Sequence, residues 1–230
     1  MSRRASGERR VERDAYETPE WVSRLVLPHV PDYVTAVWEP ACGSGKMVDV
    51  LTEEHVVYAT DITTGVDFLK ATSRPESTTL TIPQNAIITN PPFAVADRFA
   101  RKALSFMIPV GGFVALLLPI DFDSAYKRTD LFRDCPFWHK KLVLTERIVW
   151  MVTEGKDPRP SENHAWYMWC CRSGLGPPTI EYAVSSEEER RARRASLRGN
   201  ELHTYGRTDR DRGEVPDRTT RQGGRVRRSR

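Results

Sequence analysis

Short runs of β-branched and aliphatic residues recur along the chain, and each is followed by a polar or glycine-rich stretch. Runs of this length and composition are typical of buried strands in an α/β sheet. We predict strands over residues 34–38, 56–60, 85–89, 113–118, 147–151 and 165–170. Apolar residues at helical spacing predict helices over residues 18–26, 48–51 and 99–106. The first of these has Thr18 as its N-cap and Pro19 at its first position, and it ends before Pro28.

Strands that alternate with helices predict an α/β domain with a Rossmann-like, mostly parallel sheet. The last two predicted strands differ from the others, because a polar loop at residues 154–163 joins them and no helix lies between them. Strands connected in this way pair antiparallel. The sheet should therefore close with a C-terminal antiparallel pair.

Length and composition suit one medium-sized domain with a tail at each end. The chain has 230 residues, of which 39% are hydrophobic, enough for a well-formed core. We expect the polar residues 1–13 to be disordered and the domain to cover residues 14–184. Residues 185–230 are rich in arginine, and we expect a disordered tail there, with a charged helix as the alternative.

The positive charge is concentrated in the two tails. The chain carries a formal net charge of +4, yet residues 185–230 hold 14 Arg and 8 acidic residues, and residues 1–13 hold 5 Arg and 2 Glu. The domain between them is therefore acidic. A basic tail is either a solvated segment or an aid to nucleic-acid binding. Segment 121–141, in which basic and aromatic residues alternate, is either a contact for a nucleic-acid strand or a solvated loop.

The sequence argues against a membrane, secreted or metal-binding protein. It contains no apolar run long enough to cross a bilayer, and the charged N-terminus is not followed by the apolar core of a secretory signal. The cysteines show no spacing typical of a metal site, so we expect reduced thiols in a cytoplasmic protein: Cys42, Cys135, Cys170 and Cys171.

The tetrapeptide Asn90-Pro91-Pro92-Phe93 directly follows the strand predicted at residues 85–89. Two consecutive prolines cannot continue a strand, since neither has an N–H group and both fix φ at about −65°. The Asn90 amide is therefore held at the carboxyl end of a strand, the edge at which open α/β sheets bind ligands. With the Pro91 carbonyl and an exposed Phe93 ring, it would form a receptor for a planar molecule that bears an NH2 group. A proline-rich turn without function is the alternative.

The first predicted strand leads into Glu39-Pro40-Ala41-Cys42-Gly43-Ser44-Gly45. Glycines let the backbone approach a ligand closely, and the helix that follows offers free N–H groups. The segment lacks GxGxxG and Gly-Lys-Ser/Thr, so neither a dinucleotide fingerprint nor a phosphate-binding loop fits well. Glu39 disfavours a polyphosphate and suits a ligand with an ammonium group. Asp61 ends the second strand, where an acid usually binds ribose hydroxyls.

In their order and spacing, these motifs resemble those of the S-adenosylmethionine-dependent amino-methyltransferases, over residues 14–171. The resemblance implies the class I methyltransferase fold, S-adenosyl-L-methionine as the cofactor, and catalysis by the tetrapeptide that begins at Asn90. It also implies a set of cofactor-binding residues, in which Asp67 and Phe68 flank the adenine: Tyr16, Thr18, Pro19, Glu39, Pro40, Ala41, Gly43, Gly45, Asp61, Ile62, Asp67, Phe68 and Asn90.

The chemistry implied by the resemblance is methyl transfer to an exocyclic amine. The Asn90 side-chain oxygen and the Pro91 carbonyl would accept hydrogen bonds from both N–H groups, so that the nitrogen lone pair can turn toward the methyl group. Alignment of the reactants supplies much of the remaining acceleration. No general base is required first, which agrees with the absence of His or Glu beside the tetrapeptide in the sequence. Phe93 would stack on the base, which must be flipped out of duplex DNA.

The resemblance leaves three substrates for the tetrapeptide: adenine N6, guanine N2 of ribosomal RNA and glutamine N5 of release factors. The glutamine enzymes carry an N-terminal helical domain, whereas only about 30 residues precede the first strand here. The compact chain most resembles small phage or bacterial DNA adenine-N6 methyltransferases. DNA is thus the expected partner, bound through loop 121–141 and the Arg-rich tail, and RNA is the alternative.

Two other functional classes stay open at this point. A scaffold of the same fold that binds nucleic acid without catalysis is disfavoured by the intact tetrapeptide, and a nucleotide-dependent oxidoreductase is disfavoured by the missing third glycine. Three residues near the last strand are interpreted mainly as strand packing: His164, Trp166 and Trp169. Of these, Trp166 is a candidate for lining a base pocket.

Overall fold

The computed structural model describes residues 17–75, 82–150, 162–174 and 176–183, together with Arg190, Arg191 and Ala195. The chain divides into two compact units, residues 1–185 and 186–230, and the three described residues of the second unit are helical. Several predictions concern residues outside the described ranges and stay predictions: the disordered tails, the contact of Tyr16 with the cofactor, and most of loop 154–163.

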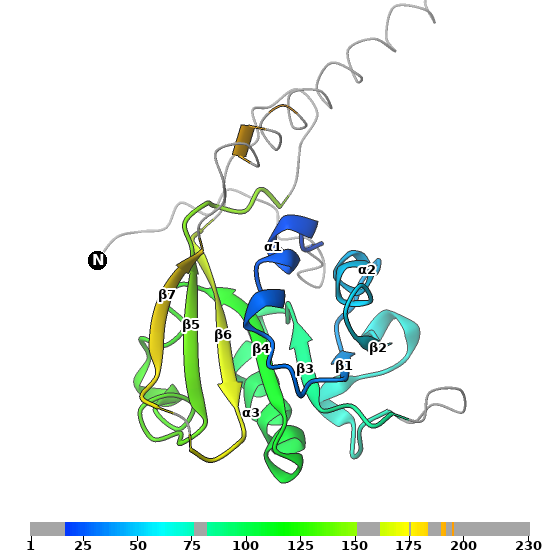
Figure 1. The fold of residues 1–230 in the computed structure, drawn as a ribbon. Coiled ribbons are helices and arrows are strands. Elements are labelled where there is room, and N and C mark those ends of the chain that lie inside the picture. The colour runs from blue at the N-terminus through cyan, green and yellow to red at the C-terminus, as the bar shows by residue number, and fades with distance from the viewer. Residues whose placement is uncertain are drawn as a thin grey trace, which may run out of the picture. The chain divides into compact units, whose positions relative to one another are not determined.

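The described strands form one sheet in the order β2-β1-β3-β4-β6-β5-β7 (Figure 1). Parallel pairing joins β1 to β2 and β3, β3 to β4, and β5 to β7, whereas β6 runs antiparallel to both of its neighbours. This confirms the predicted α/β fold with a mostly parallel sheet. The strands are β1 (Ala36–Glu39), β2 (Val56–Ala59), β3 (Ala86–Thr89), β4 (Phe113–Pro119), β5 (Trp138–Leu144), β6 (His164–Cys170) and β7 (Thr179–Ala183).

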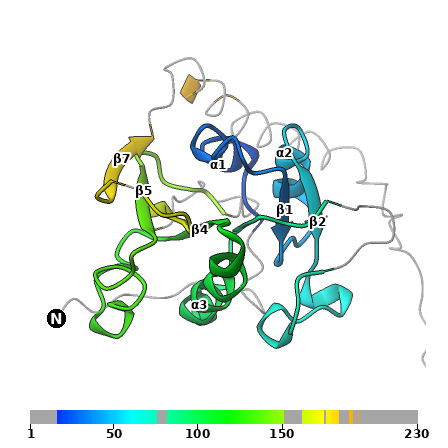
Figure 2. The ribbon, with the colours of Figure 1, turned by 60° about the horizontal axis from the view of Figure 1, so that its bottom comes forward.

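Helices cover both faces of the sheet. Figure 2 shows α1 (Glu20–Arg24) and α2 (Lys46–Leu51) on one face and α3 (Ala96–Met107) on the other. Successive residues of β4 accordingly belong to two separate cores: Leu117 packs with the residues of α1 and α2, and Leu116 packs with those of α3. A strand buried on both faces must be apolar at every position, which explains the uninterrupted apolar run that predicted it.

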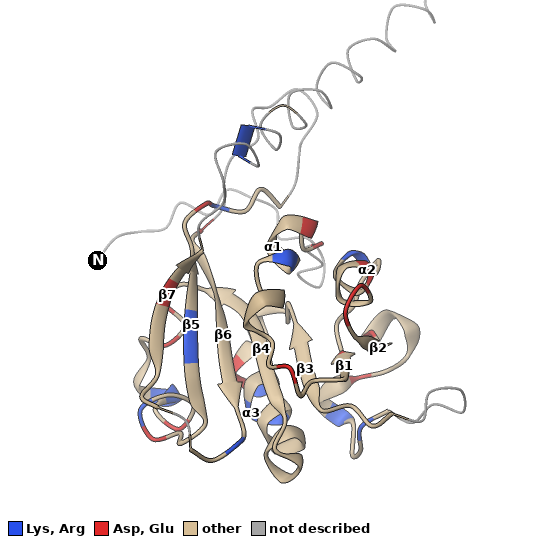
Figure 3. Cartoon of the chain, viewed as in Figure 1, with Lys and Arg blue, Asp and Glu red and all other residues tan. Residues whose placement is uncertain are grey.

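The strand predicted at residues 147–151 is wrong over its described part, residues 147–150, which form no strand. Its apolar character comes from packing, since Ile148 is fully buried in the core without being part of a ladder. The strand in this part of the chain is β5, which begins within segment 121–141, interpreted from the sequence as a nucleic-acid contact or a solvated loop, and continues beyond it. Lysines on this strand made it hard to recognise from the sequence. In the fold, Lys140 forms an ion pair with Glu181 of β7 at 2.7 Å and Lys141 forms one with Asp123 at 2.7 Å. Figure 3 shows the charged residues of β5 and β7 on neighbouring strands.

Two further boundaries differ from the prediction. The first helix begins at Glu20, with Pro19 rather than Thr18 at the N-cap position, and no side chain caps it. Thr18 is instead buried. The edge strand β7 was missed because one of its faces is exposed, with Ile180 62% and Tyr182 65% accessible, so its pattern resembles that of a surface segment.

The order in which the chain adds strands to the sheet reverses direction at β1. From β1 the chain passes to β2 on one side and then to β3 on the other, so β2 and β3 flank β1 and run parallel to it. The carboxyl ends of these three strands therefore lie next to each other at one edge of the sheet (Figure 1). Such a switch in strand order is where open α/β sheets bind ligands.

Replacement of Leu117 by alanine should strongly destabilise the fold. Leu117 is fully buried in the core beneath α1 and α2, and a cavity left at such a site costs about 2–5 kcal/mol in the free energy of unfolding. Urea denaturation measures this loss. The exposed Ile180→Ala is the matched control and should change the free energy by less than about 0.5 kcal/mol. Equal losses in the two variants would contradict the assignment of the core.

Candidate functional site

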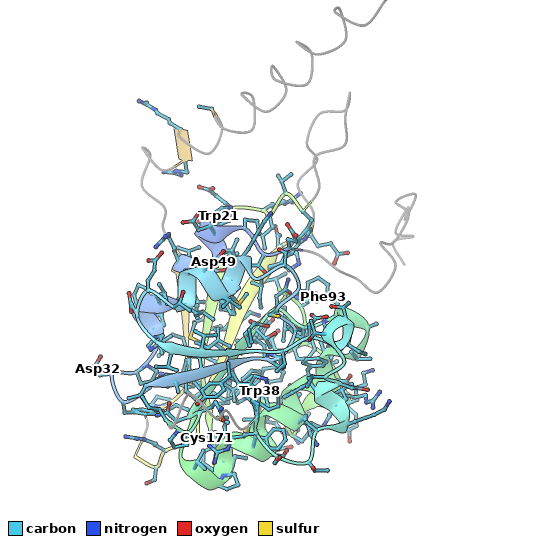
Figure 4. The ribbon with its side chains drawn as sticks, turned by 90° about the vertical axis from the view of Figure 1, so that its right-hand side faces the viewer. Trp21, Asp32, Trp38, Asp49, Phe93 and Cys171 are labelled. Carbon is cyan, nitrogen blue, oxygen red and sulfur yellow. The ribbon has the colours of Figure 1, made fainter. Side chains whose placement is uncertain are left out.

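Three polar side chains lie at the carboxyl ends of the three strands at the switch. Glu39 is the last residue of β1, while Asp61 follows β2 and Asn90 directly follows β3. Figure 4 shows Phe93 well apart from Cys171, whose amide donates a hydrogen bond to the Gly112 carbonyl just before β4 begins. The tertiary structure therefore brings together the two motifs on which the sequence interpretation depends.

Glu39 connects these two motifs by direct hydrogen bonds. Its Oε1 atom accepts one from the Thr89 hydroxyl at 2.6 Å and one from the Ala41 amide at 3.0 Å. Its Oε2 atom is buried and has no hydrogen-bond partner among the described residues. Burial raises the pKa of Glu39 to about 8, against the effect of these two hydrogen bonds. A buried oxygen without a partner is an available position for a ligand donor.

The glycine loop is hydrogen-bonded to the side chain of Asp61. Its Oδ2 atom accepts a hydrogen bond from the Gly43 amide at 3.0 Å, and its Oδ1 atom accepts two from Thr63. Burial would raise the pKa of Asp61, but the hydrogen bonds from Thr63 and Gly43 outweigh it and lower the pKa. Gly43 and Gly45 have φ values of 51° and 94°, and a Cβ atom built on either meets no atom within 4 Å. The loop thus has the left-handed backbone that glycine tolerates and open space beside it.

The residues expected beside the cofactor adenine divide into two groups. Ile62 is 58% exposed directly after Asp61, as a platform for a planar ligand would require. The ring of Phe68 is buried and packs against Trp38 and Phe99, with centroids 5.0 and 4.7 Å away. It is therefore a core residue, and only its backbone can face a ligand. Asp67 accepts a hydrogen bond from the Leu69 amide at 3.0 Å and so caps the short helix that follows.

Phe93 differs from the exposed platform that the sequence predicted. It is half-buried, and its ring lies 5.4 Å from His164 and 6.3 Å, edge to face, from Trp150. Trp150 and His164 are also in contact, with centroids 5.2 Å apart. We call these three residues the aromatic cluster. It extends the tetrapeptide, in which Asn90 and Pro92 are half-buried and Pro91 is buried.

Sequence reasoning missed Trp150 and His164 as site residues. His164 was assigned to strand packing and Trp150 to the strand predicted at residues 147–151, and only the fold brings them beside Phe93. Trp166, the residue considered for a base pocket, is fully buried and donates its indole N–H to the Val22 carbonyl at 3.0 Å, so that it anchors α1. Trp169 likewise donates to the Leu131 carbonyl at 2.7 Å, as expected of a packing residue.

The N-terminal segment contacts the glycine loop. Glu17 forms an ion pair with Lys46, the first residue of α2, and a hydrogen bond with Ser44 within the loop. These two interactions lower the pKa of Glu17. Glu17 therefore lies beside the loop, while the contacts of Thr18 and Pro19 with the cofactor stay a prediction.

Within the described part of the chain, no group of three or more His, Cys, Asp or Glu side chains is arranged to hold a metal ion. No helix in that part is long and apolar enough to cross a membrane.

No protein-family model matches the chain, and no curated protein matches its sequence. Solved structures do match it. A protein from Listeria monocytogenes, described as a candidate class I S-adenosylmethionine-dependent methyltransferase, aligns with a TM-score of 0.50 and 13% identity over 79% of this chain and 70% of that chain. The fold is that of the class I methyltransferases. At this level of identity, the likeness establishes the fold alone.

Two restriction-system subunits are also similar in structure. The methyltransferase subunit of a type I restriction-modification system from Streptococcus thermophilus has a TM-score of 0.49 and 12% identity, over 80% of this chain and 53% of that chain. A modification subunit of a candidate type I restriction enzyme from Vibrio vulnificus has a TM-score of 0.49 and 17% identity, over 75% and 48%. This chain thus spans about half the length of both subunits.

Replacement of Glu39 by glutamine should flatten the dependence of stability on pH. The pKa of Glu39 is about 8 in the folded chain against an ordinary value of 4.5. The folded chain therefore keeps a proton that the unfolded chain has released, so stability should fall as pH rises from about 5 to about 8. Thermal unfolding at intervals across this range should show a smaller fall for Glu39→Gln. Parallel profiles of the two proteins would contradict the buried, protonated state of Glu39.

Proposed function

We propose that this chain is an S-adenosylmethionine-dependent methyltransferase that acts on an exocyclic amine, with N6 of adenine in DNA as its substrate. The single observation that carries the proposal is the 2.6 Å hydrogen bond between Thr89 and Glu39. These residues immediately precede the tetrapeptide and the glycine loop, respectively. A methyl donor at the glycine loop and an amine at Asn90 would consequently lie side by side.

Several features of the chain fit the cofactor. The buried Oε2 atom of Glu39 can receive the ammonium group, and a cation at this position would favour the ionised carboxylate and lower its pKa. Asp61 keeps acceptor capacity for ribose hydroxyls, and the exposed Ile62 offers an apolar surface to the adenine. The open space beside Gly43 and Gly45 leaves the backbone accessible. When bound, S-adenosylmethionine supplies a methyl group on a sulfonium, which is already strongly electrophilic.

The task of the protein is then to prepare the nucleophile. In an aromatic amine the nitrogen lone pair is delocalised into the ring, so it must be freed before it can attack. The Asn90 amide oxygen and the Pro91 carbonyl would accept the two N–H groups and stabilise the positive charge that develops on the nitrogen. Because consecutive prolines hold the backbone rigid, these acceptors are preorganised.

The aromatic cluster supports a planar substrate. A base that stacks on the Phe93 ring would gain about 1–3 kcal/mol, which offsets part of the few kcal/mol required to flip it out of a duplex. Trp150 meets Phe93 edge to face and is half-buried, so it would contact the edge of the same base. A single-stranded substrate would avoid the cost of flipping.

Adenine in DNA rather than an RNA base is the finer part of the proposal. It follows from the resemblance to compact DNA adenine-N6 methyltransferases. The segment between β4 and β5, where Tyr126 is 91% exposed beside Lys127, supports contact with a nucleic-acid strand of either kind. The decisive experiment offers tritiated methyl donor with DNA, ribosomal RNA and release factor in parallel, followed by digestion to identify the modified unit. Label in N6-methyladenine from DNA supports the proposal, and label only in RNA or protein overturns its substrate assignment.

Asn90→Ala should lower kcat by at least about 100-fold, because it removes an acceptor that acts on charge developing in the transition state. The affinity for the cofactor, measured by calorimetry, should stay nearly unchanged. Asp61→Ala is the complementary variant and should weaken cofactor binding first, since it also releases Gly43. Equal losses of turnover and cofactor affinity in Asn90→Ala would count against its role in the chemistry.

Tyr126→Ala should weaken binding of an oligonucleotide about 10-fold, within the range measured for loss of one base–aromatic stacking contact. Fluorescence anisotropy with a labelled strand measures the affinity. Tyr182→Ala is a matched control, because Tyr182 is also an exposed tyrosine but lies on β7. The same affinity in both variants would remove Tyr126 from the proposed interface.

A further inference from the structure

His164 is the residue of the aromatic cluster that the proposed reaction leaves unused. It is the first residue of β6 and pairs with Pro119, the last residue of β4, so it lies at the same sheet edge as the tetrapeptide. Its side chain is 98% buried, its exposed fraction being 2%. The ring contacts both Phe93 and Trp150.

One nitrogen of this buried ring has no partner. The Nδ1 atom of His164 is shielded from solvent and forms no hydrogen bond within the described residues. The backbone of Glu162 also hydrogen-bonds to the ring, and we assign that bond to Nε2 because Nδ1 has none. Burial lowers the pKa of His164 to about 4, so the imidazole is neutral at physiological pH. A neutral ring that donates through Nε2 presents a lone pair at Nδ1.

We infer that Nδ1 of His164 accepts a hydrogen bond from the substrate held on Phe93, which makes His164 a specificity-determining residue. The inference rests on the proposed function, since it assigns a further contact within the same site. A buried polar atom without a partner is unfavourable, and a substrate donor would relieve this cost only in the bound state. A substrate without a suitable donor would leave the atom unpaired and bind less well.

The acceptor character of Nδ1 restricts the chemistry of the substrate. On adenine, the donors available are the two N–H bonds of the exocyclic amine, which Asn90 and Pro91 would already accept, so His164 would join one of them as the second acceptor of a three-centre hydrogen bond. Guanine offers N1–H next to its exocyclic amine as an additional donor. His164 therefore favours a base whose donors lie at or beside the methylated nitrogen, and it disfavours a planar unit with acceptors alone.

Two substitutions distinguish the hydrogen bond of Nδ1 from the aromatic contacts of the ring. In His164→Asn the amide replaces Nδ1, whereas in His164→Gln it reaches the position of Nε2, and both variants lose the aromatic contacts. With the polymer that the wild type methylates, His164→Gln should show a KM about 10-fold higher than His164→Asn, the effect of one lost hydrogen bond to a buried group. Both should bind S-adenosylmethionine equally, as measured by calorimetry. Equal KM values for the two variants would overturn the inference.

The same pair of substitutions at His55 is the matched control. Both ring nitrogens of His55 are buried without a partner among the described residues, yet His55 directly precedes β2 at the opposite edge of the sheet. His55→Asn and His55→Gln should therefore give the same KM, with melting temperatures recorded for all four variants. A difference at His55 as large as that at His164 would mean that the effect reports folding, and it would overturn the inference.

Failure of the proposed function can be distinguished experimentally from failure of the inference about His164. If the wild type transfers no methyl group to DNA, RNA or protein, that function falls whatever the variants do. The inference is then decided by anisotropy with short labelled DNA and RNA strands in the presence of S-adenosylhomocysteine. Tighter binding by His164→Asn than by His164→Gln supports it, and equal binding overturns it.

Discussion

The hydrogen bond between Thr89 and Glu39 joins the ends of two neighbouring strands in an environment from which water is excluded. At 2.6 Å it is short, and it connects the strand that leads into the glycine loop with the strand that leads into the tetrapeptide. In a buried setting such a bond fixes the relative position of its two strand ends, because neither group has water as an alternative partner. The arrangement of the candidate site depends on this link.

Polar side chains are tolerated at this edge because the strands leave the two cores there. Along β1 and β3 every residue is buried, and the apolar residues alternate between the two hydrophobic clusters. Past the carboxyl ends, Asp61 accepts hydrogen bonds from Gly43 and Thr63, and Asn90 is half-buried. The change from apolar to polar residues thus coincides with the end of each strand, and it leaves the carboxyl group of Glu39 buried at the end of β1.

The other half of the sheet contributes His164 to the aromatic cluster. The antiparallel direction of β6 brings its first residue, His164, beside the last residue of β4. The turn after β4 is held by Lys141, which donates to the Ile120 carbonyl at 2.8 Å and to Asp123 at 2.7 Å, and by the Tyr167 hydroxyl, 2.8 Å from the same carbonyl. Buried polar groups on β5 and β6 therefore position a turn that lies near the tetrapeptide only in the folded chain.

The sequence by itself determined the elements whose pattern is local. The apolar runs of β1 to β4 and β6, the helical spacing of α2 and α3, and the proline pair after β3 each identify their structure within a few residues, because a buried strand or a rigid turn imposes its own composition. Lysines on β5 and exposed side chains on β7 hid those strands, since the partners that make them acceptable, Asp123 and Glu181 for the lysines, are distant in sequence.

Only the tertiary structure decided which side chains meet. Glu39 and Thr89 are 50 positions apart, and Phe93, Trp150 and His164 come from three different segments. Phe68, expected to flank the adenine, and Trp166, a candidate for lining a base pocket, have buried side chains, whereas His164, interpreted as strand packing, contacts Phe93 of the tetrapeptide. The type of a residue indicates whether it can be buried, but the order and direction of the strands determine which residues it packs against.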